Sequence, residues 1–417
     1  MKYEVFESDC YNLYTIKTNK FKNCHMEVVF RNKCSKEYIT SSALLFDVLM
    51  ENNLDYPTRK MLARREQDLY NTNIYAVNSR VGSALLSNVV VDFLDPKYME
   101  NGSLEEIIKL AFSLIFNPNV DADEFDEETY NKVAKRLRNE IDSLKEDGKQ
   151  NSILSALKTL DKNSVRALNS SGDVNILEAL TPKKLYKFYQ KILEESIIDI
   201  YIIGNLDMKE ISKLIKKYSE FSSIKTHKIP LYLDEINVKK TINREDINNS
   251  TQMNLVQIYS FKNLDEFEIN YVIPIFNLLW GTGSLDSKLY KTVRTENSLC
   301  YNINTFYQKY DRVIILNTQI DKQNYSKTVK LIKSCFQSMV CGDIKLSELD
   351  NVKKILINSL NLIYDNPGRL IDNYLFSNIA SIPDIDTRID EFKSVTINDL
   401  IKVAKKINLV VNYRIGG

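Results

Sequence analysis

"ALTPKKLYKFYQKILEESIIDIYIIGNLD" (residues 179–207) and "SVTINDLIKVAKKINLVVNYRIGG" (residues 394–417) decide the fold of this 417-residue chain, because they repeat one pattern. In each stretch a threonine, Thr181 or Thr396, precedes a short helical pattern, which is followed by a β-branched strand and a glycine. Threonine is a favoured N-cap because its hydroxyl accepts a free backbone N–H of the first helical turn. The two copies indicate that the chain consists of two similar halves.

Other segments repeat at nearly the same separation. Residues 133–150 match residues 352–369, and "ALLSNVVVDFLD" (84–95) matches "DRVIILNTQID" (311–321). The latter pair is typical of strands that end in an acid, and each is followed by a helical pattern. The sequence therefore predicts a duplicated α+β unit of roughly 200 residues, with a mostly antiparallel sheet and helices packed on one face.

The boundary between the two halves is expected in the polar stretch "FSSIKTHKIPLYLDE" (221–235), which holds one proline between two periodic regions. This predicts a first domain over residues 1–222, a linker over 223–236 and a second, homologous domain over 237–417.

Composition excludes several classes of function. Hydrophobic residues make up 44% of the chain and charged residues 27%, and the formal net charge is +1. Such a balance predicts neither nucleic acid nor an anionic membrane as the main partner. No apolar run reaches the roughly 18 residues that span a bilayer, and the first residues lack the apolar segment of a signal peptide. We therefore expect a cytoplasmic protein.

Histidine and cysteine limit the possible chemistry further. The two histidines, His25 and His227, lie in a strand-like alternation and in the linker, so both are interpreted as strand or surface residues. Too few histidines remain for a typical catalytic zinc site. The six cysteines form no C-x-x-C pair and are expected to be free thiols.

The stretch "WGTGSLDSKLYKTVRTENSLCY" (280–301) is the first candidate site. A phosphate-binding loop is excluded, because no Lys-Ser/Thr pair follows and no further glycine completes a dinucleotide fingerprint. Gly281 and Gly283 instead predict a flexible turn before a helix that ends near Arg294, followed by a strand. Arg294 and Tyr301 could both face a groove; the alternative is a surface arginine and a core tyrosine.

The same stretch closely resembles the second-domain signature of the pitrilysin, insulysin and mitochondrial processing peptidase family of zinc metallopeptidases. The matching residues are Leu279, Gly281, Gly283, Ser287, Leu289, Tyr290, Arg294, Leu299 and Tyr301. The segment 201–218 also resembles the strand-glycine-helix that closes the first domain in this family. The resemblance extends over essentially the whole chain, and it implies two homologous domains and so accounts for the duplication.

Active members of that family carry H-x-x-E-H on the first long helix of the first domain. In "SSALLFDVLM" (41–50) the two histidine positions hold Leu44 and Val48, and Asp47 occupies the position of the general base. An apolar side chain cannot bind zinc, so we expect neither a metal nor catalysis here. The third-ligand position maps near residues 131–133, where no acid is present.

Three glutamates flank the third-ligand position: Glu127, Glu128 and Glu140. An active enzyme that used unusual ligands would need such acids to hold zinc without histidine. We regard this as a remote alternative, which about one zinc per purified chain would revive.

The resemblance implies that Gly281, Gly283, Arg294 and Tyr301 contact substrate. It predicts a non-catalytic subunit of a heterodimeric zinc peptidase, with zinc in a homologous partner chain that carries H-x-x-E-H. The two chains would enclose short unfolded peptides, bound as an added strand at a sheet edge. The alternative is a stand-alone peptide-binding or scaffold protein, such as a homodimer, without peptidase activity.

Overall fold

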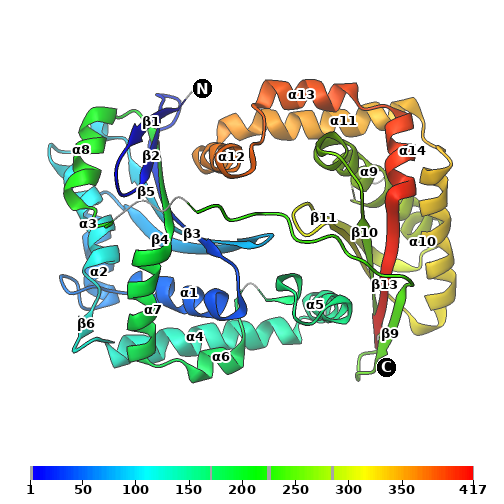
Figure 1. The fold of residues 1–417 in the computed structure, drawn as a ribbon, viewed down its shortest axis with the longest axis horizontal. Helices are drawn as coiled ribbons and strands as arrows, with labels where there is room; N and C mark the ends of the chain where they lie inside the picture. The colour runs from blue at the N-terminus through cyan, green and yellow to red at the C-terminus, as the bar shows by residue number, and fades with distance from the viewer. Residues whose placement is uncertain (1–2, 170, 223–226, 283–285, 417) are drawn as a thin grey trace. The chain divides into compact units, whose positions relative to one another are not determined.

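The computed structural model describes residues 3–169, 171–222, 227–282 and 286–416, which form two compact units (Figure 1). The first unit comprises Met1–Ser143, Leu168–Pro230 and Asn366–Leu375. The second unit comprises Leu144–Ala167, Leu231–Asp365 and Phe376–Gly417. Each unit thus contains the sheet of one half of the sequence and a helical segment from the other half.

The first unit contains a six-stranded sheet. Its strand order is β1 (Glu4–Glu7), β2 (Asn12–Lys17), β8 (Ile197–Gly204), β3 (Asn23–Lys33), β5 (Ala84–Leu94) and β4 (Asn73–Val81). All neighbours are antiparallel except β2 and β8, which run parallel. The central strand β8 is buried along its whole length, consistent with its continuous β-branched sequence.

The second unit repeats this arrangement with five strands. Their order is β11 (Cys300–Gln308), β12 (Val313–Ile320), β10 (Met253–Phe261), β13 (Ile407–Ile415) and β9 (Ile242–Asp246). Again one pair, β13 with β9, is parallel and the others are antiparallel. The predicted duplication with mostly antiparallel sheets is confirmed. A short hairpin, β6 (Val120–Asp121) with β7 (Glu124–Phe125), lies outside both sheets.

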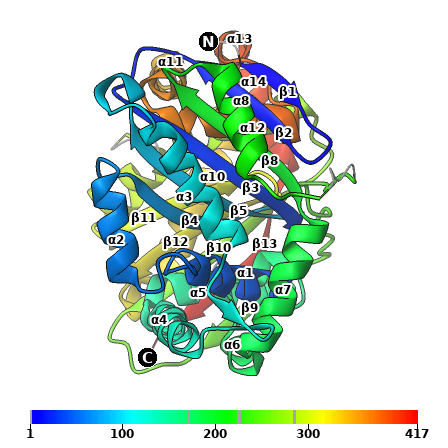
Figure 2. The ribbon, with the colours of Figure 1, turned by 90° about the vertical axis from the view of Figure 1, so that its left-hand side faces the viewer.

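Helices cover one face of the first sheet, as Figure 2 shows. They are α1 (Lys36–Leu49), α2 (Arg59–Asp68), α3 (Ser103–Phe116), α4 (Glu127–Glu146), α6 (Val174–Ala179), α7 (Pro182–Glu195) and α8 (Met208–Tyr218). Their apolar stripes and the alternate side chains of the strands enclose one hydrophobic core. Phe30 of β3 and Phe46 of α1 make an edge-to-face contact at its centre, with ring centroids 5.1 Å apart.

The helices of the second unit enclose a core around the buried Trp280, whose ring contacts Tyr259, Phe276 and Phe336. They are α5 (Gly148–Leu160), α9 (Ile273–Asn277), α10 (Tyr325–Val340), α11 (Leu346–Asn361), α13 (Ile385–Ser394) and α14 (Ile397–Lys406). Tyr290–Glu296, expected as an ordinary helix, is π-helical. Within the described residues, no helix is long and apolar enough to cross a membrane.

The repeated stretches that opened the sequence fold as expected. Thr181 caps α7 by accepting the Lys184 N–H, and β8 follows. Thr396 caps α14 by accepting the Asp399 N–H, and β13 follows. The strands predicted over 84–95 and 311–321 are β5 and β12, and the helices α3 and α10 come after them.

A further helix lies on the opposite face of each sheet, which the sequence did not predict. In the second unit, α5 places Ala156 and Leu157 against apolar residues of β10, β12 and β13. In the first unit, the start of α12 (Pro367–Ala380) lies on the six-stranded sheet, where Tyr374 contacts Tyr3 with ring centroids 5.0 Å apart. The domain boundaries proposed at residues 222 and 237 stay a prediction.

Candidate functional site

The helix α1 carries the degenerate motif in the first unit. Ser35 caps this helix by accepting the Tyr38 N–H at 3.1 Å. Leu44 and Val48 are buried in the hydrophobic core, at 0% and 3% exposure, whereas the Asp47 side chain is 35% exposed. The two former ligand positions therefore serve packing, and only Asp47 reaches a polar environment.

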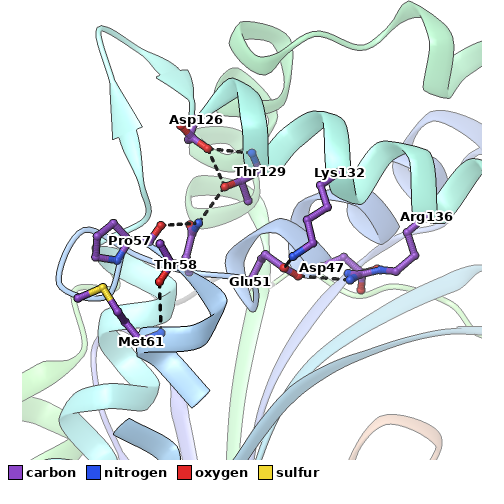
Figure 3. A network of polar contacts seen from close by, with 10 residues as sticks. Asp47, Glu51, Pro57, Thr58, Met61, Asp126, Thr129, Lys132 and Arg136 are labelled. Carbon is purple, nitrogen blue, oxygen red and sulfur yellow. Dashed lines mark hydrogen bonds and ion pairs between the residues drawn. The ribbon is translucent and has the colours of Figure 1, made fainter. Parts of the chain in front are cut away.

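Two cations from α4 meet two carboxylates beside α1 (Figure 3). Arg136 donates from Nη2 to Asp47 Oδ2 and from Nη1 to Glu51 Oε2, each at 3.3 Å. Lys132 Nζ donates to Glu51 Oε1. Asp47, Glu51, Lys132 and Arg136 thus form one ion-pair network, which joins the end of α1 to α4.

Neutral hydrogen bonds extend this junction toward the start of α4. The Asn52 side-chain amide donates to Thr129 Oγ1 at 2.8 Å and to the Pro57 carbonyl at 3.2 Å. Asp126 accepts from the backbone N–H and the hydroxyl of Thr129, at 2.8 and 2.7 Å. The junction is therefore hydrogen-bonded along about two turns of α4, as Figure 3 shows.

The pKa values of Asp47 and Glu51 shift in opposite directions. Burial raises the pKa of Asp47 above its ordinary value, and Arg136 offsets this only in part. Burial would also raise the pKa of Glu51, but the hydrogen bonds and charges of Lys132 and Arg136 hold it below its ordinary value. Glu51 is thus the better compensated charge.

The residues at this position do not fit a zinc ion. Leu44 and Val48 offer no lone pair, and Lys132 and Arg136 supply positive charge where a cation would need donors. Glu127 and Glu128 are exposed in the first turn of α4, and Glu140 accepts a hydrogen bond from Ser171. Across the described residues, no group of three or more His, Cys, Asp or Glu side chains is arranged to hold a metal.

The second candidate site lies in the second unit. Gly281 is buried and requires a glycine, because an added Cβ would lie 1.8 Å from Thr305 Oγ1. The flexible turn expected at Gly281 is not observed, because Gly281 lies in the π-helical segment Leu278–Thr282; Ser287 donates its hydroxyl hydrogen to the Gly281 carbonyl at 2.6 Å. Gly283 lies outside the described residues.

Arg294 and Tyr301 are brought into contact. The Arg294 guanidinium lies over the ring of Tyr290 at 4.6 Å and over the ring of Tyr301 at 5.1 Å, and it also donates to the Tyr290 hydroxyl. Tyr301 is 80% exposed, so it is not a core tyrosine. The pair presents a planar cation and a phenol on the surface of this unit, a combination that can bind a carbonyl or carboxylate.

The two histidines differ in environment. His25 is buried on β3 between the carboxylates of Glu27 and Asp92, so its strand location is confirmed. His227 is exposed and lies outside the strands and helices. The six cysteines are free thiols.

Sequence reasoning missed Glu51, Lys132 and Arg136. A signal was present in α4, where Lys132 and Arg136 are four residues apart and therefore share one face of the helix, whereas Glu51 lies in the turn after α1. What the sequence could not supply is the pairing of α1 with α4.

Comparisons with known proteins agree with this fold and with the absence of the zinc-binding H-x-x-E-H motif. The family description "Peptidase M16 inactive domain" matches residues 179–356. A "probable inactive metalloprotease YmfF" of Bacillus subtilis is 24% identical over 418 residues, covering 97% of this chain and 95% of that protein.

Solved structures show the same fold. A conserved protein from Enterococcus faecalis matches with a TM-score of 0.93 and 24% identity, covering 100% of this chain and 99% of that one. A peptidase M16 inactive domain from Pseudomonas fluorescens matches with a TM-score of 0.79 and 14% identity, covering 100% and 98%. The matches support a non-catalytic homologue of the pitrilysin (M16) zinc peptidases, and the two zinc-ligand positions of the family motif hold Leu44 and Val48.

Proposed function

We propose that this chain is the non-catalytic subunit of a heterodimeric, cytoplasmic zinc peptidase. A homologous partner chain with H-x-x-E-H would supply the zinc and the hydrolytic chemistry. This chain would complete the enclosure and help to bind short unfolded peptides.

The observation that carries the proposal is a free sheet edge beside the degenerate motif. Among the described strands, β4 ends the six-stranded sheet and pairs with β5 alone, and α1 packs against it. Its other edge offers backbone N–H and C=O groups to an extended peptide, the usual geometry of strand addition. At the nearby motif position, Leu44 and Val48 offer no zinc ligands and Asp47 pairs with Arg136, so a peptide bound here would be held and not cut.

Arg294 and Tyr301 supply a second surface for substrate. Their guanidinium and hydroxyl suit the carbonyls or the terminal carboxylate of a peptide. Gly281 supports this surface, because the absence of a Cβ lets its own backbone approach Thr305 of β11.

The decisive experiment is co-purification with a homologous H-x-x-E-H chain, followed by peptide cleavage with and without this subunit. We expect a stable pair and cleavage that depends on both chains. The double substitution Arg294→Ala and Tyr301→Phe is expected to weaken cleavage mainly through KM; unchanged cleavage would remove these residues from the proposal. A homodimer that binds peptide unaided and forms no pair would instead favour the stand-alone scaffold.

A further inference from the structure

A polar pocket of about 370 Å³ lies in the first unit, on the sheet face opposite the hydrophobic core. Its floor is formed by β3, β4 and β5, and its wall by the first turns of α12 with the residue before them. The lining residues are His25, Glu27, Tyr75, Val77, Asn88, Val90, Asp92, Asn366, Pro367, Gly368, Arg369 and Asp372. Neither the degenerate motif nor the Arg294 site includes any of them.

The floor of the pocket holds a buried ionic triad. His25 and Glu27 are only 7% and 6% exposed. His25 contacts Asp92 Oδ1 through Nδ1 at 2.6 Å and Glu27 Oε1 through Nε2 at 2.9 Å. Burial alone would lower the pKa of His25, but the two carboxylates outweigh it and raise the pKa to about 9. The histidine therefore carries a proton at neutral pH and donates from both ring nitrogens.

The pocket still has a surplus of negative charge. Glu27, Asp92 and Asp372 face only two cations, His25 and Arg369. Asp372 is accessible, and within the described part of the chain it has neither a hydrogen bond nor an ion pair. Partial burial of the carboxylate and the charge of Glu27 raise its pKa to about 6, although the charge of His25 lowers it, so it is mainly ionised at neutral pH. This carboxylate is free to receive a cation.

A buried acceptor on the pocket lining also lacks a partner. The Asn88 amide nitrogen donates to Glu27 Oε2 at 2.8 Å, whereas its oxygen is buried with no hydrogen bond. Native proteins retain few such atoms, and a bound donor is one reason for them.

The second unit shows that helix packing on this sheet face does not require charge. There α5 covers the corresponding face through Ala156 and Leu157, against Val256, Ile258 and Ile315. Buried charges destabilise a fold unless they are well paired, and an apolar replacement is often at least as stable. The charges under α12 are thus better explained by binding than by packing.

We propose that this pocket binds an alkylammonium or guanidinium group, as in a lysine or arginine side chain or the amino terminus of a peptide. The cation would pair with Asp372 at the wall, and the ring of Tyr75 adds an aromatic surface that favours cations. A metal ion is a poorer occupant, because the described His, Cys, Asp and Glu residues form no cluster with metal-binding geometry. As a subsite for a basic peptide residue, the pocket rests on the proposed function; as a cation site, it does not.

The test uses the full chain and three small probes: agmatine, N-acetyl-lysine methylamide and the uncharged N-acetyl-norleucine methylamide. Calorimetry is expected to show binding of the two cations and none of the uncharged probe. Asp372→Asn should weaken binding about tenfold, the value of one charge-assisted pair. Arg369→Gln should strengthen binding, because it removes a repulsive charge.

The matched control is Asp350→Asn, which changes another exposed acid, on α11 in the second unit. It should leave binding within about twofold of the parent, which rules out a general effect of net charge. Equal binding of all three probes, or equal effects of Asp372→Asn and Asp350→Asn, would overturn the cation site.

A peptide series separates this inference from the proposed function. If the two-chain peptidase cleaves peptides with and without a basic residue equally well, the cation site fails as a substrate subsite. The subunit role stands in that case. If agmatine binds with the predicted variant pattern and no active pair forms, the subunit role fails while the cation site stands.

Discussion

At the scale of single residues, Asp47 tests whether any chemistry survives at the degenerate motif. Its carboxylate pairs with Arg136, and the apolar Leu44 and Val48 cannot hold the zinc whose bound water a general base would activate. Asp47→Asn is therefore expected to leave peptidase activity of the two-chain complex within about twofold, measured as kcat/KM on one peptide. A loss of several orders of magnitude in a normally folded complex would show that Asp47 acts in catalysis.

The two cations of α4 are expected to stabilise the fold. The Glu51 side chain is only 8% exposed and is compensated by both Lys132 and Arg136. Removing both cations, as Lys132→Met with Arg136→Met, leaves a buried carboxylate unpaired and should cost roughly 2 kcal/mol of unfolding free energy. Urea unfolding measures this loss.

Two controls accompany that double substitution. Lys135→Met changes an exposed lysine of the same helix and should cost less than about 0.5 kcal/mol. Adding Glu51→Gln to the double variant should restore much of the stability, because the buried charge is then gone. If Lys135→Met is as destabilising as the double substitution, the network does not hold α1 to α4.

Predictions for single residues were correct where the chemical type of the side chain is sufficient to decide the outcome. Leu44 and Val48 are apolar, so their burial and their failure as ligands followed from side-chain type. The partners of Asp47 did not follow, because Arg136 is 89 residues away and only tertiary packing brings it close. Tyr301 was left open between core and groove, since one strand position cannot tell which face is covered.

At the scale of elements, prediction was strongest where a cap, a periodic helix and a β-branched strand coincide. Thr181 with α7 and β8, and Thr396 with α14 and β13, are such cases. Tyr290–Glu296 shows the limit: its apolar spacing predicts a helix but does not distinguish a π-helical from an α-helical backbone.

The two caps are expected to differ in strength. Thr396 forms a capping box, in which the Asp399 carboxylate accepts from both the backbone N–H and the hydroxyl of Thr396, at 2.9 and 2.6 Å. Thr181 makes a single cap bond to the Lys184 N–H at 3.2 Å. Thr396→Ala should therefore cost about 1.5 kcal/mol and Thr181→Ala about 1 kcal/mol.

Thermal or urea unfolding of the two variants tests this order. Thr396→Ser and Thr181→Ser keep the hydroxyl and should lie within about 0.5 kcal/mol of the parent. Equal losses for both alanine variants would mean that the reciprocal bond of the box adds nothing measurable.

At the scale of the whole molecule, the duplication was readable but the exchange of helices was not. The repeat separation of about 215 residues places α5 and α12 at equivalent positions, after α4 and α11. Each helix is nevertheless assigned to the compact unit of the other half, α5 wholly and α12 through residue 375. Local periodicity records which face of a helix is apolar, but it does not record which sheet that face covers.

The stability of the first unit depends on pH through the charged floor around His25, on which the first turns of α12 lie. The pKa of His25 rises from an ordinary value of 6.5 to about 9 through Asp92 and Glu27, despite burial. A raised pKa means that the folded state binds the proton more tightly than the unfolded state. The stabilisation is therefore complete below about pH 6.5 and is lost as the pH rises through about 9.

We expect the unfolding free energy to fall by up to roughly 3 kcal/mol across that window, and the fall to be absent in His25→Gln. Asp372 faces the same pocket with a pKa raised to about 6, but the stability linked to its proton is lost between about pH 3.8 and 6, below the window. Arg369 keeps its charge throughout. Urea unfolding of both proteins across the window measures the difference, and parallel curves would show that the triad around His25 is not the proton-linked element.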